Sequence, residues 1–190
     1  IETRLYAEDP YRNFLPSIGR LTRYRPPAET ASDEHIIRND TGVYEGGEIR
    51  MYYDPMIAKL CSWAPSRAGA IEHMRLALDR FEVEGIGHNL PFLSAVMDHP
   101  KFTSGDMTTA FIAEEYPDGF EGVTLPAAAL RRVVAASAAM YRVGEIRRAQ
   151  ISGRLDNHAR KVGDHWVVCL QGETHAVTVA ADPNGALVTF

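Results

Sequence analysis

Arg38 is the residue of this chain whose type and setting best suit catalysis. It follows two branched apolar residues and precedes an amide and a carboxylate in the run EHIIRND at residues 34–40. A guanidinium stays protonated near neutral pH, so it does not act as a base. Its planar set of N–H donors can instead hold an oxygen on which negative charge develops. The alternative is an ordinary strand arginine that pairs with Asp40 or Glu34, and the residue types alone favour that alternative.

Motifs for other kinds of chemistry are absent from the sequence. It contains no GxGxxG or GxxxxGK[ST] loop for nucleotides, no GxSxG nucleophile turn and no HExxH zinc motif. The seven histidines lack the spacing typical of metal ligands, so we expect no metal site within the chain. The glycines of residues 41–47 predict a hairpin turn rather than a phosphate loop, because no helix start follows them.

Short strands and helices must position Arg38. Alternating polar and apolar residues between turn signals predict short strands over residues 1–25, and the glycines of residues 41–53 suggest two strands joined by a turn. The apolar run at residues 57–63 predicts a buried strand. The expected helices of this part run from residue 66 to a stop at Gly85, from Asn89 to just before His99, and over residues 108–116.

A turn-rich segment, YPDGFEG at residues 116–122, predicts a domain boundary. It divides the chain into two expected domains, residues 1–116 and 117–190. The second begins with one long helical pattern over residues 126–150. Strands of an antiparallel meander are expected after it, at residues 166–170, 174–180 and 186–190. Helices and antiparallel strands in separate runs indicate the α+β class.

The long helix combines an apolar stripe with a basic surface. The stripe consists of Leu130, Val134, Ser137 and Tyr141, with Val133 and Met140 beside it. Between residues 126 and 161, eight basic residues stand against two acidic ones, a net charge of +6, whereas the remainder carries −11. Such a helix is either a docking surface for an acidic partner, with Arg142, Arg147 and Arg148 as contacts, or a solvated face. A third possibility is that it only buries its stripe against its own strands.

Composition indicates a globular protein and argues against several partners. The chain has 190 residues, of which 45% are hydrophobic and 24% charged, enough to bury a core. Its net charge of −5 opposes binding to nucleic acid or anionic membrane, and no apolar run is long enough to span a bilayer. Two distant cysteines predict reduced thiols in an intracellular protein. The first residues show no targeting segment, and we expect the chain to start within a strand.

Three runs of the chain resemble the biotin carboxylase family. They are IETRLYAEDP at residues 1–10, LPSIGRL at 15–21 and YYDPMIAKL at 52–60, in the family's order and spacing, and the likeness covers residues 1–116. The run FIAEEYPDGFEG at 111–122 is similar to alpha subunits of the propionyl-CoA carboxylase type. The resemblance implies the C-terminal part of an ATP-grasp biotin carboxylase domain, an antiparallel sheet with helices. A long helix and the first strands of a BT-type barrel, which docks a partner subunit, would follow it.

The resemblance also implies roles for three residues. The family's catalytic arginine is expected fourteen residues before the first tyrosine of the YYD motif, which is Arg38 in this sequence. There it would hold the ureido oxygen of biotin while negative charge develops on it. Tyr53 and Asp54 would fix the loop that carries Arg38, since an aspartate at this place can cap a turn.

The implied activity belongs to a whole alpha subunit. ATP would activate bicarbonate, biotin would be carboxylated, and the carboxyltransferase beta subunit would pass the carboxyl group to propionyl-CoA. Biotin would be attached to a downstream domain, and ATP with Mg or Mn would be held mainly by upstream residues, so the chain alone is expected to be inactive.

The resemblance further implies partners and a compartment. Expected partners are the beta subunit and other alpha subunits of a hetero-oligomer, in a bacterial cytoplasm or a mitochondrial matrix. The identity of the acyl-CoA rests on resemblance alone. The alternative hypothesis is a non-catalytic assembly module that docks a carboxyltransferase partner, in which residues 117–190 matter most.

Overall fold

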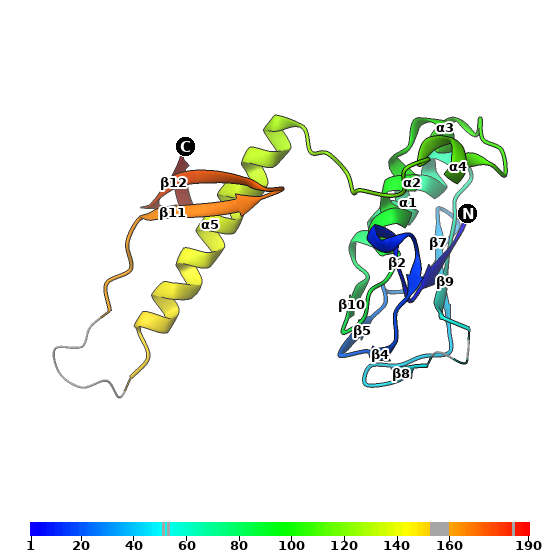
Figure 1. Cartoon of the computed structure of the whole chain (residues 1–190), viewed down its shortest axis with the longest axis horizontal. Coiled ribbons are helices and arrows are strands. Elements are labelled where there is room, and N and C mark those ends of the chain that lie inside the picture. Colours follow the sequence, from blue (N-terminus) through cyan, green and yellow to red (C-terminus); the bar gives the residue numbers. More distant parts are fainter. Residues whose placement is uncertain (51, 53, 153–159, 184) are drawn as a thin grey trace. The chain divides into compact units, whose positions relative to one another are not determined.

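The computed structural model describes residues 1–190 apart from 51, 53, 153–159 and 184, and it forms two compact units (Figure 1). The first unit is Ile1–Val123 and the second is Thr124–Phe190. Helices and antiparallel sheets make up both, so the expected α+β class is confirmed, and the described strands form no closed barrel. The described helices include none that is long and apolar enough to cross a membrane. The domain limits 1–116 and 117–190 stay a prediction.

The first unit is organised around a four-stranded antiparallel sheet in the order β1-β9-β7-β6. Alternation along the strands gives this sheet an apolar inner face and a charged outer face: Leu5 and Leu60 are buried, whereas their neighbours Arg4 and Lys59 point outward. The predicted strand at 57–63 is confirmed as β9, one of the two inner strands. The bounds are β1 Glu2–Tyr6, β6 Thr30–Ala31, β7 Ile36–Thr41 and β9 Met56–Trp63.

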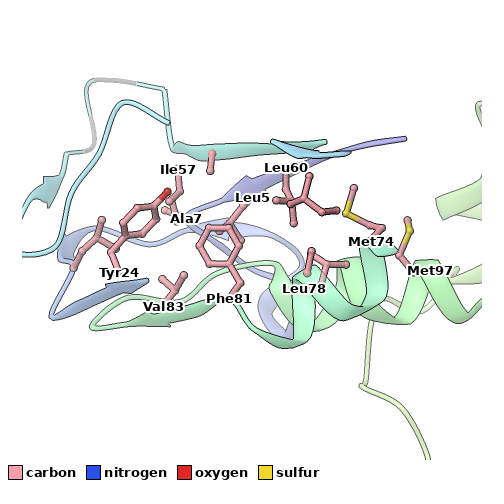
Figure 2. Close-up of a cluster of buried hydrophobic side chains, with 14 of the residues drawn as sticks. Leu5, Ala7, Tyr24, Ile57, Leu60, Met74, Leu78, Phe81, Val83 and Met97 are labelled. Carbon is pink, nitrogen blue, oxygen red and sulfur yellow. The ribbon is translucent and has the colours of Figure 1, made fainter. Parts of the chain in front are cut away.

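Helices cover the inner face of this sheet, and α1 contributes most of the contact (Figure 2). Met74 and Leu78 of α1 are fully buried against Leu5 and Leu60. The Ser66 hydroxyl accepts the Gly69 N–H at 3.1 Å and starts the helix, as its position predicted. The bounds are α1 Arg67–Asp79, α2 Leu90–Asp98, α3 Pro100–Ser104 and α4 Phe111–Glu115.

The predicted stop of α1 at Gly85 is wrong. The helix ends at Asp79, and Glu82–Glu84 form strand β10, which pairs with β5, Arg23–Arg25. Arg23 and Arg25 of β5 form ion pairs with Glu82 and Glu84 of β10 across this pair of strands. The remaining short elements of the first unit are β2 Glu8–Asp9, the 3-10 helix Pro10–Arg12, β3 Leu15–Pro16, β4 Gly19–Arg20 and β8 Glu48–Ile49.

The second unit is one long helix packed on one face of a three-stranded antiparallel meander. Its core contains Val134 and Ala138 of the helix and Val177 and Val179 of the central strand. The predicted long helix and meander are confirmed, but Ser137 and Tyr141, assigned to the buried stripe, are exposed, because the small Ala138 side chain faces the sheet instead. The bounds are α5 Ala127–Ala149, β11 His165–Leu170, β12 Glu173–Asp182 and β13 Gly185–Thr189.

Candidate active-site face and docking helix

Arg38 lies on the outer face of the four-stranded sheet. Because side chains alternate along β7, the neighbouring Ile37 is buried while the Arg38 side chain is 62% exposed. Its Nη2 donates to Asp40 Oδ2 at 2.9 Å and lies 3.9 Å from Cys61 Sγ. The ion pair with Asp40, which the sequence offered as the alternative to a catalytic role, is therefore formed. Asp40 raises the pKa of Arg38 through this bond, which keeps the guanidinium charged.

A second guanidinium, Arg4, shares the same face. The pairing register aligns Glu2 with Cys61 and Arg38 across three strands, and Arg4 with Lys59 and Asp40. Arg4 Nε donates to Glu2 Oε1 at 2.9 Å. Arg4 was not among the site residues predicted from the sequence, although the alternation around buried Thr3 and Leu5 is a signal that could have placed it outward.

Charge on this outer face is mixed but favours anions. Three cations, Arg4, Arg38 and Lys59, stand with two carboxylates, Glu2 and Asp40. The hydrogen bond from Arg4 lowers the pKa of Glu2, and the same bond raises the pKa of Arg4, so both groups are ionised near neutral pH. The outer face therefore presents exposed, permanently charged donors, which suit an oxygen that gains negative charge.

The loop before β9 holds the residues expected to position Arg38. The Met56 N–H donates to Asp54 Oδ1 at 2.9 Å, so Asp54 caps the turn that leads into β9. The strand that follows Asp54, β9, pairs with β7, which carries Arg38, and the positioning role of Asp54 stays a prediction. Tyr53 lies outside the described residues.

Two of the three arginines expected to dock a partner make ion pairs within the second unit. Arg142 donates from Nε and Nη2 to Asp164 Oδ1, at 3.1 and 2.7 Å, and ties α5 to the segment before β11. Arg148 and Arg160 both contact Glu145, whose side chain is only 4% exposed. Glu145 raises the pKa of Arg148 through their hydrogen bond.

Arg147 differs from these two. It lies on the exposed side of α5, and the described part of the chain offers it no ion pair. The basic helix therefore contains both structural arginines and a solvent-facing one. No group of three or more His, Cys, Asp or Glu residues able to hold a metal ion occurs among the described residues.

Comparison with known proteins decides between these expectations at the level of the family. Residues 2–114 match the family model of the biotin carboxylase C-terminal domain. The chain belongs to the biotin carboxylase family. Residues 133–190 of this biotin carboxylase chain match the propionyl-coenzyme A carboxylase BT domain. The resemblance inferred from the sequence is thus confirmed in both parts.

Relatives extend the match over the whole chain. It is 72% identical over 205 residues to the propionyl-CoA carboxylase alpha chain of Ruegeria pomeroyi, which covers 100% of this chain and 30% of that protein. It is 38% identical over 195 residues to the mitochondrial propionyl-CoA carboxylase alpha chain of Mus musculus, covering 100% of this chain and 26% of that protein. The chain therefore spans less than a third of the length of these relatives.

Solved structures support the fold of the first unit. The biotin carboxylase domain of a thermophilic 2-oxoglutarate carboxylase, bound to bicarbonate, aligns with a TM-score of 0.55 at 39% identity, over 61% of this chain and 25% of that one. Pyruvate carboxylase from Rhizobium etli aligns with a TM-score of 0.56 at 34% identity, over 76% of this chain and 13% of that one.

Proposed function

We propose that this chain is the part of a biotin-dependent acyl-CoA carboxylase alpha subunit, of the propionyl-CoA carboxylase type, in which the biotin carboxylase domain ends and the docking domain begins. One observation carries the proposal: both family matches occur in tandem, within a chain 72% identical over its length to such an alpha chain. The domains are proposed as residues 1–116 and 117–190, and the compartment as a bacterial cytoplasm or a mitochondrial matrix.

The proposed reaction is ATP- and bicarbonate-dependent carboxylation of biotin, for transfer to propionyl-CoA on the carboxyltransferase beta subunit. Biotin would supply the nitrogen that accepts the carboxyl group, and its ureido oxygen would gain negative charge. The outer sheet face fits such a group, because it offers exposed guanidinium donors and three cations against two carboxylates. ATP and Mg or Mn would be held mainly by other parts of the subunit.

Arg38 is the proposed catalytic residue, with Tyr53 and Asp54 as loop-positioning residues. The Asp40 carboxylate binds Arg38 Nη2 and restrains the guanidinium while leaving the side chain largely exposed. Arg4 is a second candidate for the same role, because it lies on the same face with an equivalent carboxylate partner in Glu2. Substituting the two arginines separately distinguishes them.

The full-length alpha subunit with its beta subunit tests the reaction. Incorporation of labelled bicarbonate into propionyl-CoA should require ATP, and acetyl-CoA or a longer acyl-CoA should be poorer acceptors. If the subunits together fix no bicarbonate, or fix it without ATP, the proposed reaction is wrong.

The basic helix α5 is proposed to help dock the beta subunit. The alternative function is a non-catalytic assembly module that docks this partner. Arg147 best suits direct contact, whereas Arg142 and Arg148 first serve ion pairs within the second unit. Arg147→Glu should weaken association with the beta subunit most at low salt and leave the unfolding temperature unchanged. Arg142→Glu should lower the unfolding temperature, because it repels Asp164. Unchanged association of Arg147→Glu at low salt would place the docking surface elsewhere.

A further inference from the structure

The turn-rich segment at residues 116–122 is packed onto the first unit. Phe120 is only 4% exposed and joins Phe92 and Ala95 in a buried cluster. Its ring centroid lies 5.4 Å from those of both Tyr11 and Phe92, and 5.9 Å from that of Tyr116. Burial of this aromatic ring stabilises the attachment of residues 116–122 to the first unit. The turn residues of this segment predict only a domain boundary.

Two glycines turn the backbone so that Phe120 can enter the cluster. Gly119 and Gly122 have φ values of 92° and 93°, which only glycine adopts readily. The Gly119 N–H donates to the Tyr116 carbonyl at 3.1 Å and closes the first turn. A Cβ on Gly122 would lie 3.4 Å from Tyr11 Cε1, so the backbone at Gly122 passes close to the Tyr11 ring.

The loop that contributes Phe14 to this cluster has an uncommon backbone conformation. Asn13 and Phe14 are consecutive non-glycine residues with φ values of 54° and 57°. Such left-handed backbone is costly for residues with a Cβ and persists only where the surroundings fix it. The Phe14 ring packs edge-on against Phe92 with centroids 5.0 Å apart, so the same cluster that takes up Phe120 holds this turn.

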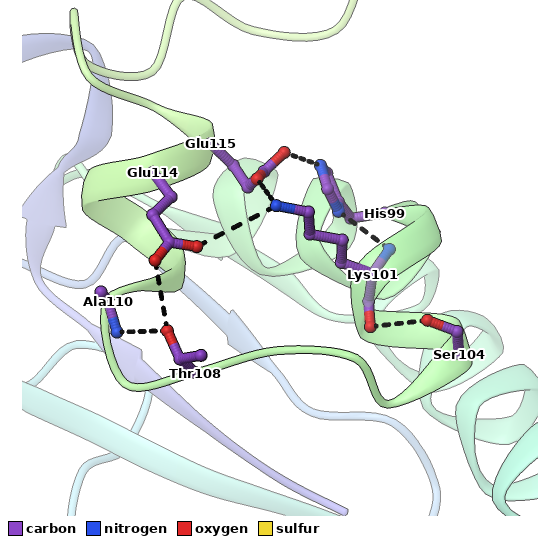
Figure 3. Close-up of polar contacts among 7 residues, drawn as sticks. All are labelled: His99, Lys101, Ser104, Thr108, Ala110, Glu114 and Glu115. Carbon is purple, nitrogen blue, oxygen red and sulfur yellow. Dashed lines mark hydrogen bonds and ion pairs between the residues drawn. The ribbon is translucent and has the colours of Figure 1, made fainter.

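Polar contacts fasten the preceding helix, α4, to α3 (Figure 3). The Glu115 carboxylate binds His99 Nε2 at 3.2 Å and Lys101 Nζ, while Glu114 lies 4.0 Å from Lys101 Nζ. The Thr108 hydroxyl lies 3.4 Å from Glu114 and accepts the Ala110 N–H at 3.1 Å. Tyr116 links these contacts to the Phe120 cluster, because its ring centroid lies 6.3 Å from that of His99 and 5.9 Å from that of Phe120.

We propose that residues 111–120 form a strap, fastened at Glu115 and at Phe120, that sets the length of the free linker between the two units. With the strap attached, the free linker is confined to the residues between Val123 and Ala127, where α5 begins. Detaching the strap would free residues 111–123 and so lengthen the linker by thirteen residues. A longer flexible linker lowers the effective concentration of one unit around the other. The strap itself does not depend on the proposed reaction.

Hydrogen exchange of the full-length subunit tests the strap. The Tyr116 and Gly119 amides, which donate to Ile112 and Tyr116 carbonyls, should exchange at least about tenfold more slowly than those of Thr124 and Leu125. Phe120→Ala should accelerate exchange over residues 111–120 by about tenfold or more, because it removes a buried ring. Tyr44→Ala is the control, since it removes an exposed ring from the same unit.

Gly122→Ala provides a second perturbation that leaves the aromatic cluster intact. It should also accelerate exchange over residues 116–120, whereas Gly46→Ala, at a φ of 88° but with open space around it, should not. The strap is refuted if the wild-type amides at 116 and 119 exchange as fast as those at 124 and 125. It is equally refuted if neither Phe120→Ala nor Gly122→Ala changes exchange over these residues.

Discussion

Substitution of Val134 tests how the long helix packs. Val134 is fully buried between α5 and the meander, whereas the adjacent Val133 is 40% exposed. Val134→Ala removes two buried methyl groups, and each buried methylene or methyl costs about 0.5–1.5 kcal/mol when removed. The two groups together cost about 1–3 kcal/mol, and alanine regains about 0.5 kcal/mol of helix propensity, so we expect a net loss of about 0.5–2.5 kcal/mol. Val133→Ala gains the same propensity and loses little burial, so it should be neutral or slightly stabilising.

Urea unfolding followed by fluorescence resolves this difference. The chain contains two tryptophans, and in a Trp63→Phe background Trp166, which packs against Tyr141, reports on the second unit alone. With a urea m value of about 1–3 kcal/mol/M for a small protein, each kcal/mol lost should lower the urea midpoint by about 0.3–1 M. Equal destabilisation by Val133→Ala and Val134→Ala would refute the packing.

Three further predictions concern titration and ion pairing. Burial lowers the pKa of His88 below the usual 6.5, so the unfolded state binds the proton more readily than the folded state. The stability of the first unit should therefore fall as pH drops below about 6.5, and this pH dependence should disappear in His88→Asn. The hydrogen bond from Lys101 lowers the pKa of Glu115 below 4.5, so this ion pair stabilises the first unit above that pH and its contribution is lost as pH falls through the lowered pKa. Glu115→Gln should therefore weaken the dependence of unfolding on acid pH, and an unchanged dependence would contradict this. Arg142→Ala should accelerate amide exchange at residues 160–165 while α5 stays protected, and the exposed Arg147→Ala is its control.

Strong local patterns of the sequence were enough to predict most of the fold. The apolar run of β9 and the Ser66 cap of α1 are local signals, and the structure follows them. β10 was missed because Glu82–Glu84 is short and depends on pairing with Arg23–Arg25, which is distant in the sequence. The buried stripe of α5 was misassigned at Ser137 and Tyr141. Ala138 is buried instead, and because residues 137 and 138 lie three and four positions after Val134, periodicity allows either of them on its face.

In the candidate sites too, contacts between residues close in the sequence could be predicted, whereas contacts between distant residues could not. The pair of Arg38 with Asp40 spans two residues on one strand and could be anticipated from the sequence. The position of Arg4 on the same face depends on β9 lying between β1 and β7. Likewise, the buried Glu145 is paired with both Arg148 and Arg160, and the contact with Arg160, fifteen residues away, does not follow from helical charge patterning.

Carboxylation of free biotin by the full-length alpha subunit, with ATP and bicarbonate, tests most directly whether the outer sheet face holds the catalytic arginine. We expect Arg38→Ala to lower kcat by about 100-fold or more, the usual effect of removing a donor to a developing oxyanion, with the fold intact. Loss in Arg4→Ala and full activity in Arg38→Ala would move the role to Arg4. Wild-type turnover in both variants would contradict a catalytic role for this face.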